Sequence, residues 1–253
     1  RAIMPEPVAA QHDVYPVAAH RVPTRRLEEG RYRVRFASSP QELEAVQALR
    51  FQIFNVELGE GLEESWRSGL DQDPFDAICH HLIVEDRVAG VIVGTYRMQT
   101  ADMARTASAG HPHGLGFYSA GEFDLSMLPA EVIEQSVEVG RACIAVEHRN
   151  TQVLFLLWRG LALYVAHNQL RYFFGCCSLT SQDPDEGAAM ARRLAAEGRM
   201  HPTVRVEPLP ALACVGDADA YLHGLAAGLT GDRHDAAHAL HEKIVPGAVG
   251  VGA

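Results

Sequence analysis

Glu138, Gly140 and Arg141 stand within the otherwise apolar segment SVEVGRACI, residues 136–144. A charged pair inside a strand is costly unless the two side chains satisfy each other or meet a ligand. In a regular strand residues three apart point to opposite faces, so Glu138 and Arg141 would diverge. A β-bulge at Gly140 would bring them to one side, as bulges often do at active sites. The segment predicts either a structural ion pair or a general base, Glu138, beside an orienting cation, Arg141.

Carboxylates are concentrated in a second segment, residues 57–76. It contains Glu57, Glu60, Glu63, Glu64, Asp71, Asp73 and Asp76 against the single Arg67. Such a segment can concentrate and hold a cationic substrate. A solvated acidic loop is the simpler interpretation of the glutamates. Further along, Glu122 and Asp124 alternate with apolar residues, so they share a face and either line a site or cap a turn.

Cysteine and histidine add no strong signal for covalent or metal chemistry. The five cysteines show no CxxC spacing, and Cys176 and Cys177 lack an adjacent base, so buried free thiols are expected rather than a nucleophile. His80 and His81 are adjacent and are expected on opposite faces of a strand. Three other histidines have helical spacing that suits a metal, but a polar helix face is preferred and no metal site is predicted: His234, His238 and His241.

Composition limits the class of protein. The chain has 253 residues, 47% hydrophobic and 21% charged, as in an ordinary soluble globular protein. The net charge of −10 argues against broad nucleic-acid binding. The longest apolar run, residues 153–166, is too short to span a bilayer, and the N-terminal segment shows no secretory signal. A cytoplasmic location is expected, with peripheral contact at the inner membrane as the alternative.

Hydrophobic periodicity predicts the elements that carry these residues. Strands are expected at 32–37, 80–86, 87–100, 136–146 and 171–179, and helices at 38–58, 129–135, 151–170 and 183–198. Residues 1–30 are predicted to be a mobile extension, residues 31–207 the main domain, and residues 208–253 a poorly patterned segment with short helical pieces. This order of elements indicates an α/β or α+β layer fold, a sheet covered by helices.

Seven motifs in order resemble a known family. They are LRFQIF (49–54), DPFDAICHHLIVED (73–86), VGTYRM (93–98), GFYSAGEFDLS (116–126), EVGRACI (138–144), LLWRGLALY (156–164) and FGCCSL (174–179). Together they cover roughly residues 31–180 and resemble the bacterial ornithine lipid synthases. These hemolysin-like enzymes of the Gcn5-related N-acyltransferase superfamily acylate ornithine from acyl carrier protein. The resemblance implies a mixed, mostly antiparallel sheet with helices on both faces.

The chain is also similar to the autoinducer synthases, which acylate S-adenosylmethionine from acyl carrier protein. The matching positions are Arg50, Phe54, Asp73, Asp76, Arg97, Glu138 and Arg141. The tryptophan that those synthases carry after the first helix is missing from NVELGEG, residues 55–61. The superfamily's Gly-rich pyrophosphate loop for coenzyme A is also missing from VEHRNTQ, residues 146–152, which favours a carrier-protein donor.

The resemblance implies an acyl-carrier-protein-dependent N-acyltransferase. It would transfer a 3-hydroxyacyl or fatty acyl group to the α-amine of ornithine, giving lyso-ornithine lipid, with no tightly bound cofactor and the donor held on phosphopantetheine. Glu138 and Arg141 would be catalytic. The implied substrate-binding residues are Arg50, Phe54, Asp73, Asp76, Arg97, Glu122 and Asp124, and the implied acyl-chain pocket is Leu154, Phe155 and Trp158.

Two clusters of arginine are the candidate landing surfaces for the acidic carrier protein. One comprises Arg21, Arg25, Arg26, Arg31, Arg33 and Arg35, and the other Arg149, Arg192, Arg193 and Arg199. Other functions stay open. An autoinducer synthase or another long-chain N-acyl amino acid synthase has the same expected fold, and a membrane-lytic hemolysin represents a different class.

Overall fold

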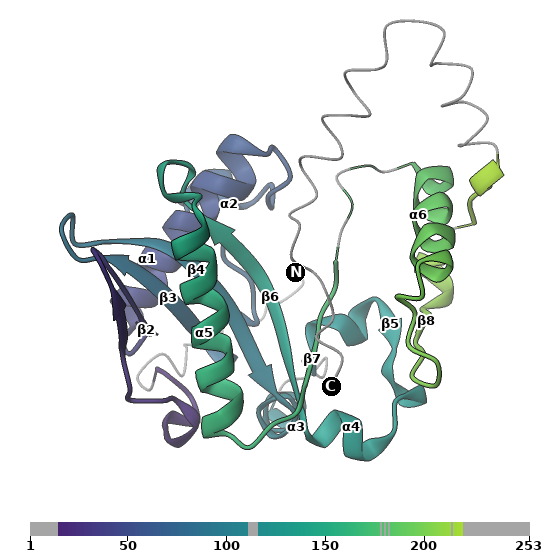
Figure 1. The fold of residues 1–253 in the computed structure, drawn as a ribbon, viewed down its shortest axis with the longest axis horizontal. Coiled ribbons are helices and arrows are strands. Elements are labelled where there is room, and N and C mark those ends of the chain that lie inside the picture. Colours follow the sequence, from purple (N-terminus) through teal and green to yellow (C-terminus); the bar gives the residue numbers. More distant parts are fainter. Residues whose placement is uncertain are drawn as a thin grey trace, which may run out of the picture. The chain divides into compact units, whose positions relative to one another are not determined.

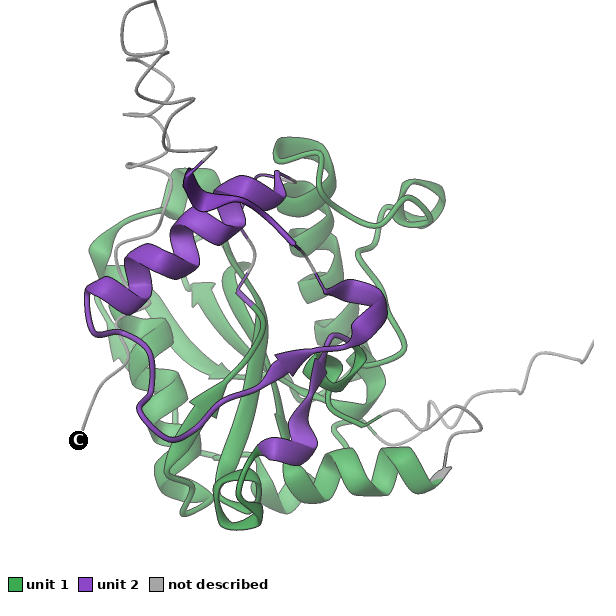
Figure 2. Cartoon of the chain, turned by 90° about the vertical axis from the view of Figure 1, so that its right-hand side faces the viewer, with its two compact units in different colours: residues 1–121, 128–176 green, residues 122–127, 177–253 purple. Residues whose placement is uncertain are grey.

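The computed structural model describes residues 15–110, 116–177, 179, 181, 183–213 and 215–219. The chain divides into two compact units (Figure 2). Unit 1 comprises Arg1–Gly121 and Leu128–Cys176, and unit 2 comprises Glu122–Met127 and Cys177–Ala253. Each unit is described by itself.

Unit 1 is built on a six-stranded sheet with the strand order β1-β2-β3-β4-β6-β7 (Figure 1). The strands are β1 (Leu27–Glu29), β2 (Tyr32–Phe36), β3 (His80–Asp86), β4 (Val91–Thr100), β6 (Ser136–Ile144) and β7 (Tyr172–Phe174). Neighbouring strands are antiparallel except β6 and β7, which are parallel. The predicted mixed, mostly antiparallel sheet is confirmed.

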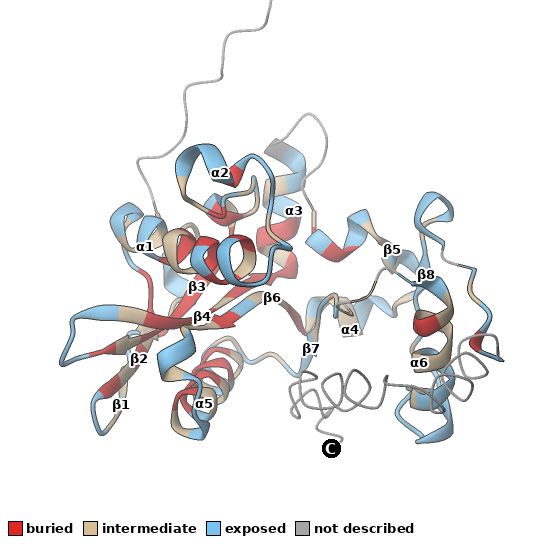
Figure 3. Ribbon diagram, turned by 90° about the horizontal axis from the view of Figure 1, so that it is seen from above, coloured by how far each residue is buried: buried red, intermediate tan, exposed pale blue. Residues whose placement is uncertain are grey.

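Helices cover both faces of this sheet (Figure 3). α5 (Thr151–His167) lies on one face, and α1 (Pro40–Phe51), α2 (Ser65–Ser68) and α3 (Ala101–Gly110) lie on the other. The short α4 (Ala130–Glu134) precedes β6. The stretch that forms α3 was expected to be irregular, because its small residues show no strong apolar period.

The packing of α5 onto the sheet forms the main core. The helix begins where the Asn150 side chain accepts a hydrogen bond from the Val153 backbone N–H. Its apolar face then meets β2 and β3, with Leu157 fully buried. A Cβ added at Gly160 would lie 2.5 Å from a Leu82 methyl group, so a larger residue here would force the packed side chains of Leu82 and Val34 to shift.

α1 carries the first of the site residues on the opposite face. Ser39 caps its start by accepting a hydrogen bond from the Glu42 backbone N–H. The helix passes directly into a π-helical turn, Gln52–Glu57, which lies within the predicted helix 38–58. π-helical turns often occur at functional sites, and this one carries Phe54.

β6 and β7 pair only over a short length. Ladder contacts join residues 136–138 to residues 172–174, and the two strands then diverge (Figure 1). Gly175 passes close to the carbonyl of Val139, where a Cβ would clash. Among the described residues, no strand pairs with residues 139–144 of β6 on the side away from β4.

The N-terminal boundary differs from the prediction. Residues 27–29 form β1, Val22 and Leu27 pack against the core, and the carbonyl of Val17 accepts a hydrogen bond from His80. The prediction of a mobile extension is therefore wrong for residues 15–30, and residues 1–14 lie outside the described part of the chain.

Unit 2 contains α6 (Pro184–Ala196) and a two-stranded sheet, β5 (Phe123–Asp124) with β8 (Glu207–Pro208). Asp183 caps α6 by accepting from the Asp185 backbone N–H. The division between the units near residue 176 falls inside the predicted domain 31–207. Most of the predicted C-terminal segment, residues 220–253, lies outside the described residues. In the parts of the chain that are described, no helix is long and apolar enough to cross a membrane.

Candidate active site

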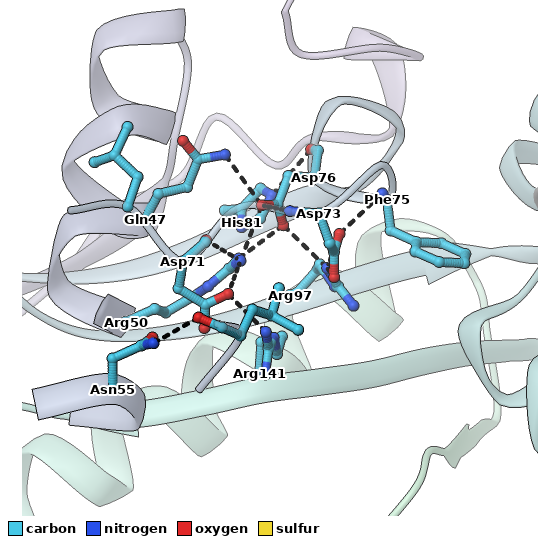
Figure 4. Close-up of polar contacts among 12 residues, drawn as sticks. Gln47, Arg50, Asn55, Asp71, Asp73, Phe75, Asp76, His81, Arg97 and Arg141 are labelled. Carbon is cyan, nitrogen blue, oxygen red and sulfur yellow. Dashed lines mark hydrogen bonds and ion pairs between the residues drawn. The ribbon is translucent and has the colours of Figure 1, made fainter. Parts of the chain in front are cut away.

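Arg50 is the centre of a buried polar network (Figure 4). Its guanidinium is completely buried and donates to both carboxylate oxygens of Asp76, at 2.7 and 2.9 Å. It also donates to the carbonyl and the Oδ1 atom of Asp71, at 2.6 and 3.1 Å. Gln47, one helical turn earlier on α1, donates to Asp76 at 3.0 Å. The buried face of α1 is therefore hydrogen-bonded to the acidic segment, residues 57–76.

Arg97 joins β4 to the same carboxylates. It donates to Asp73 at 2.6 Å and to Asp76 at 3.0 Å. The Asp73 Oδ1 atom also accepts from the backbone N–H of Phe75, which fixes the turn that follows Asp73. The guanidinium of Arg97 lies 5.6 Å from the centre of the Phe75 ring, in a cation–π arrangement.

Arg141 reaches the network through a bulge in β6. Opposite β4, Gly140 pairs with Arg97 and Cys143 pairs with Thr95, so two β6 residues oppose one β4 residue. Arg141 lies in this irregularity with φ of 49°, which places the predicted bulge one residue later than Gly140. Its guanidinium donates to Asp71 at 2.6 Å.

The Arg141 guanidinium also lies 5.0 Å from the centre of the Phe54 ring, in a second cation–π arrangement. Its side chain keeps 24% of its surface exposed, more than either other arginine of the network. Arg141 is therefore the basic member that solvent reaches most readily.

Glu138 does not pair with Arg141. Its two carboxylate oxygens accept hydrogen bonds from the backbone N–H groups of Tyr118 and Ser119, at 2.8 and 2.7 Å. The predicted alternative of a structural ion pair between Glu138 and Arg141 is therefore wrong. Glu138 is instead a buried carboxylate that holds the 118–119 turn against β6. Its role as a base stays a prediction.

The charges of the site do not balance. Burial alone would raise the pKa of Asp76, but Arg50 and Arg97 hold it well below its usual range. Burial lowers the pKa of His81 to about 3, so this ring is neutral at pH 7. Three guanidinium groups, Arg50, Arg97 and Arg141, pair with three carboxylates, Asp71, Asp73 and Asp76, and the buried Glu138 adds a fourth carboxylate that pairs with none of them. The surplus negative charge suits a cationic ligand.

Two predicted site residues lie outside this network. Glu122 and Asp124 belong to unit 2. Hydrogen bonds from the side chain and from the backbone N–H of Ser126 lower the pKa of the exposed Asp124 carboxyl, whose Oδ1 atom accepts from that N–H. Of the two alternatives for Asp124, the turn cap is the one observed.

The predicted acyl-chain pocket is not assembled. Phe155 is 61% exposed, and Trp158 packs against the core cluster. Leu154, the third residue of the prediction, is half-buried. The sheet-facing side of α5 is filled by side chains such as Leu157 and Leu161, each 1% exposed. The apolar character of this helix is explained by core packing, and the prediction of a slot between it and the sheet is wrong.

The cysteines and histidines follow the expectations in part. Cys79 and Cys143 are buried, and burial raises the pKa of Cys143 to about 12. Cys176 is half-buried and donates to the Ser119 hydroxyl, whereas Cys177 is exposed, so neither is a fully buried core thiol. His80 and His81 have different partners on opposite sheet faces, as predicted: Tyr164 for the first and the Asp76 carbonyl for the second.

No metal site is found in the described part of the chain. The three C-terminal histidines with metal-compatible spacing lie outside it: His234, His238 and His241.

The arginine clusters are largely paired. In unit 1, Arg21 pairs with Asp102, Arg31 with Asp86, Arg33 with Glu28, Arg35 with Glu42, and Arg149 with Glu57. In unit 2, Arg192 pairs with Asp219, and Arg193 and Arg199 pair with Glu197. These carboxylates offset most of the positive charge expected of a landing surface for an acidic carrier.

Sequence reasoning missed several functional candidates. Asp71 belongs to the acidic segment, but nothing in its spacing singled it out as the carboxylate shared by two arginines. The backbone donors at Tyr118 and Ser119 have no signature in sequence. Gln99 on β4 was not considered, although a polar residue in a β-branched strand was a visible signal.

Part of the chain is similar to a known family of domains. Residues 49–159, which include the three arginines and the three aspartates of this network, match the acetyltransferase (GNAT) domain family. The fold is that of a GNAT domain.

The sequence is also similar to proteins named L-ornithine N(alpha)-acyltransferase. It is 35% identical to that of Brucella abortus (strain 2308) over 61% of this chain and 55% of the relative. It is 35% identical to that of Rhizobium meliloti (strain 1021) over 61% of this chain and 52% of the relative. It is 34% identical to that of Agrobacterium fabrum (strain C58 / ATCC 33970) over 63% of this chain and 54% of the relative. The resemblance inferred from the motifs is confirmed, and the chain spans about half the length of these curated relatives.

Two solved structures are similar to this chain at 15% sequence identity. The AHL synthase LasI covers 58% of this chain and 72% of its own, with a TM-score of 0.41. An N-acetyltransferase from Lactobacillus plantarum covers 66% and 84%, with a TM-score of 0.39. At these scores neither similarity supports an inference about activity.

Proposed function

We propose that this chain is an N-acyltransferase that moves a 3-hydroxyacyl group from acyl carrier protein to the α-amine of ornithine, giving lyso-ornithine lipid. The observation that carries the proposal is the similarity to L-ornithine N(alpha)-acyltransferases at about 35% identity. The buried network of arginines and aspartates around β6 supplies the chemistry that such a reaction needs.

The acceptor would be held by charge. The surplus carboxylate near β6 favours a substrate with two ammonium groups. The Arg141 side chain is partly exposed, whereas its Nε atom is buried and has no hydrogen-bond partner among the described residues. A guanidinium with a free donor binds a carboxylate readily, so Arg141 would orient the α-carboxylate of the amino acid.

The donor would lie along β6 where β7 has diverged. The edge of β6 beyond Val139, whose carbonyl Gly175 approaches closely, can pair with the extended phosphopantetheine arm through backbone hydrogen bonds, as a strand would. Backbone N–H groups of this edge would also stabilise the oxyanion that forms on the thioester carbonyl. A carrier-protein donor fits the sequence, because VEHRNTQ, residues 146–152, shows no Gly-rich loop for coenzyme A.

The reaction would proceed without an acyl-enzyme. Glu138 takes one proton from the α-ammonium, directly or through one water, and the amine nitrogen attacks the thioester carbonyl carbon. The C–S bond then breaks, and the nitrogen passes its second proton to the departing thiolate, so that the carrier leaves as the free thiol. Glu138 has room for this role, because each carboxylate oxygen has a second acceptor site beyond the one used by the 118–119 turn.

The test is an acylation assay on the purified chain. Matched 3-hydroxyacyl thioesters of acyl carrier protein and of coenzyme A are incubated with ornithine, lysine, S-adenosylmethionine and glycine, and products are identified by mass spectrometry. The proposal expects an ornithine amide from the carrier-protein thioester. A homoserine-lactone product would identify an autoinducer synthase instead. If no amide forms with any of these amines, the proposed acyltransferase activity is wrong.

A further inference from the structure

Gln99 on β4 is a buried amide without a partner. Its side chain is 1% exposed, and neither its Oε1 nor its Nε2 atom has a hydrogen-bond partner among the described residues. A buried amide left unpaired costs free energy on the order of 1–3 kcal/mol, so folded proteins rarely keep one without a use.

The position of Gln99 points to the reaction centre. Gln99 pairs directly with Glu138 across the β4–β6 ladder, so the two side chains stand next to each other on the same face. Arg97, two residues earlier on β4, shares this face, whereas Met98 points into the core behind it. Glu138 does not satisfy Gln99, because its oxygens are turned to the Tyr118 and Ser119 backbone N–H groups.

We propose that Gln99 binds an uncharged polar group of the acyl donor, one that both donates and accepts a hydrogen bond. The inference rests on the proposed acyl transfer. A neutral amide cannot compensate a buried charge, so the charged groups of the acceptor belong to the arginines and aspartates. Two groups of the donor have the required chemistry: the hydroxyl on carbon 3 of the acyl chain, and the amides of the phosphopantetheine arm.

Gln99 would then act as a specificity-determining residue. A site built to hydrogen-bond a substrate hydroxyl discriminates strongly against the analogue that lacks it, because the buried amide is then left unpaired. If the partner is instead a pantetheine amide, the hydrogen bond to Gln99 stabilises the binding of donors with and without the hydroxyl equally. The two sources therefore differ in selectivity between donors.

The test compares Gln99→Met with Gln47→Met, the matched change at a buried glutamine that has a partner in Asp76. Methionine removes the unpaired amide while keeping the volume, so Gln99→Met is expected to melt at the wild-type temperature or above it, and Gln47→Met below it. A Gln99→Met variant that melts as early as Gln47→Met would show a structural role and overturn the inference.

Kinetics on the same preparations assign the ligand. Wild type and Gln99→Met are assayed with 3-hydroxyacyl and unsubstituted acyl thioesters of equal length on acyl carrier protein. Loss of at least tenfold in kcat/KM for the 3-hydroxyacyl donor alone assigns the hydroxyl, and equal loss for both donors assigns a pantetheine amide. Unchanged kcat/KM for both overturns the inference while the proposed function stands. A wild type inactive with both donors overturns the proposed function and, with it, this inference.

Discussion

Arg141 and Asp71 are seventy residues apart in sequence, and their side chains meet at 2.6 Å between Nη2 and Oδ1. The same Asp71 oxygen accepts from the fully buried Arg50, at 3.1 Å. Asp71 therefore links the guanidinium that solvent can reach on β6 to the one that holds α1 in place.

Asp71→Asn is expected to loosen Arg141 while leaving Arg50 paired with Asp76. The affinity for the amino-acid acceptor should fall because Asp71 no longer fixes the orientation of the Arg141 guanidinium. KM for ornithine should rise about tenfold, which corresponds to a loss of about 1.4 kcal/mol of binding free energy. The measurement is steady-state kinetics with ornithine varied at a saturating donor. Glu57→Gln, which weakens a surface pair with Arg149, is the matched control and should leave KM unchanged. Equal KM values for both variants would contradict the orienting role of Arg141.

Arg50→Met is expected to destabilise the domain. Removing this guanidinium leaves the Asp71 and Asp76 carboxylates buried without it, and breaking a buried pair in this way costs about 3–5 kcal/mol. The free energy of unfolding is measured by urea denaturation. Arg159→Met, which breaks an exposed pair with Glu29, should cost less than about 1 kcal/mol. If the two losses were equal, the Arg50 network would not be a structural support of the site.

Acid is expected to weaken the fold through the two buried histidines. His80 donates from Nε2 to the Val17 carbonyl and accepts at Nδ1 from the Tyr164 hydroxyl, so it is neutral. Burial lowers the pKa of His80 from 6.5 to about 4 and that of His81 to about 3. Between the ordinary pKa of 6.5 and these lowered values, both histidines are protonated in the unfolded chain and neutral in the folded chain. Stability is thus complete above pH 6.5 and falls toward pH 4, by about 1.4 kcal/mol per pH unit for each histidine.

Melting temperatures between pH 7.5 and 4.5 check this slope. His80→Gln should flatten it, whereas His167→Gln, at an exposed position, should keep the wild-type slope. A His80→Gln profile parallel to that of the wild type would mean that His80 titrates normally in the folded protein.

Much of the fold followed from hydrophobic pattern. β2, β3, β4 and β6 alternate or are rich in β-branched residues, and α5 has a continuous apolar stripe, so these elements were predicted within a few residues. α3 was missed because ADMARTASAG offers few large apolar residues to set a period. β1 was missed because three residues at the sheet edge carry too little pattern to read.

The residues of the site were predicted from the sequence only in part. The resemblance selected Arg50, Asp73, Asp76, Arg97 and Arg141, and the structure brings these five residues into one network. The error about Phe155 and Trp158 arose because an apolar helix face looks the same in sequence whether it meets a core or a ligand. The partners of Glu138 are backbone groups of a distant turn, and only folding reveals them.

Glu138→Gln separates a general base from a carboxylate that only supports the 118–119 turn. Glutamine keeps the shape but presents its NH₂ group to one of the two backbone N–H donors at residues 118–119, so some loss of melting temperature is expected. The decisive quantity is the single-turnover rate of amide formation by the folded variant, measured with its melting curve on one preparation. If Glu138 is the base, this rate falls about 10²–10⁴-fold at a temperature where the variant is fully folded. A folded variant that acylates ornithine at the wild-type rate would show that Glu138 only holds the turn against β6.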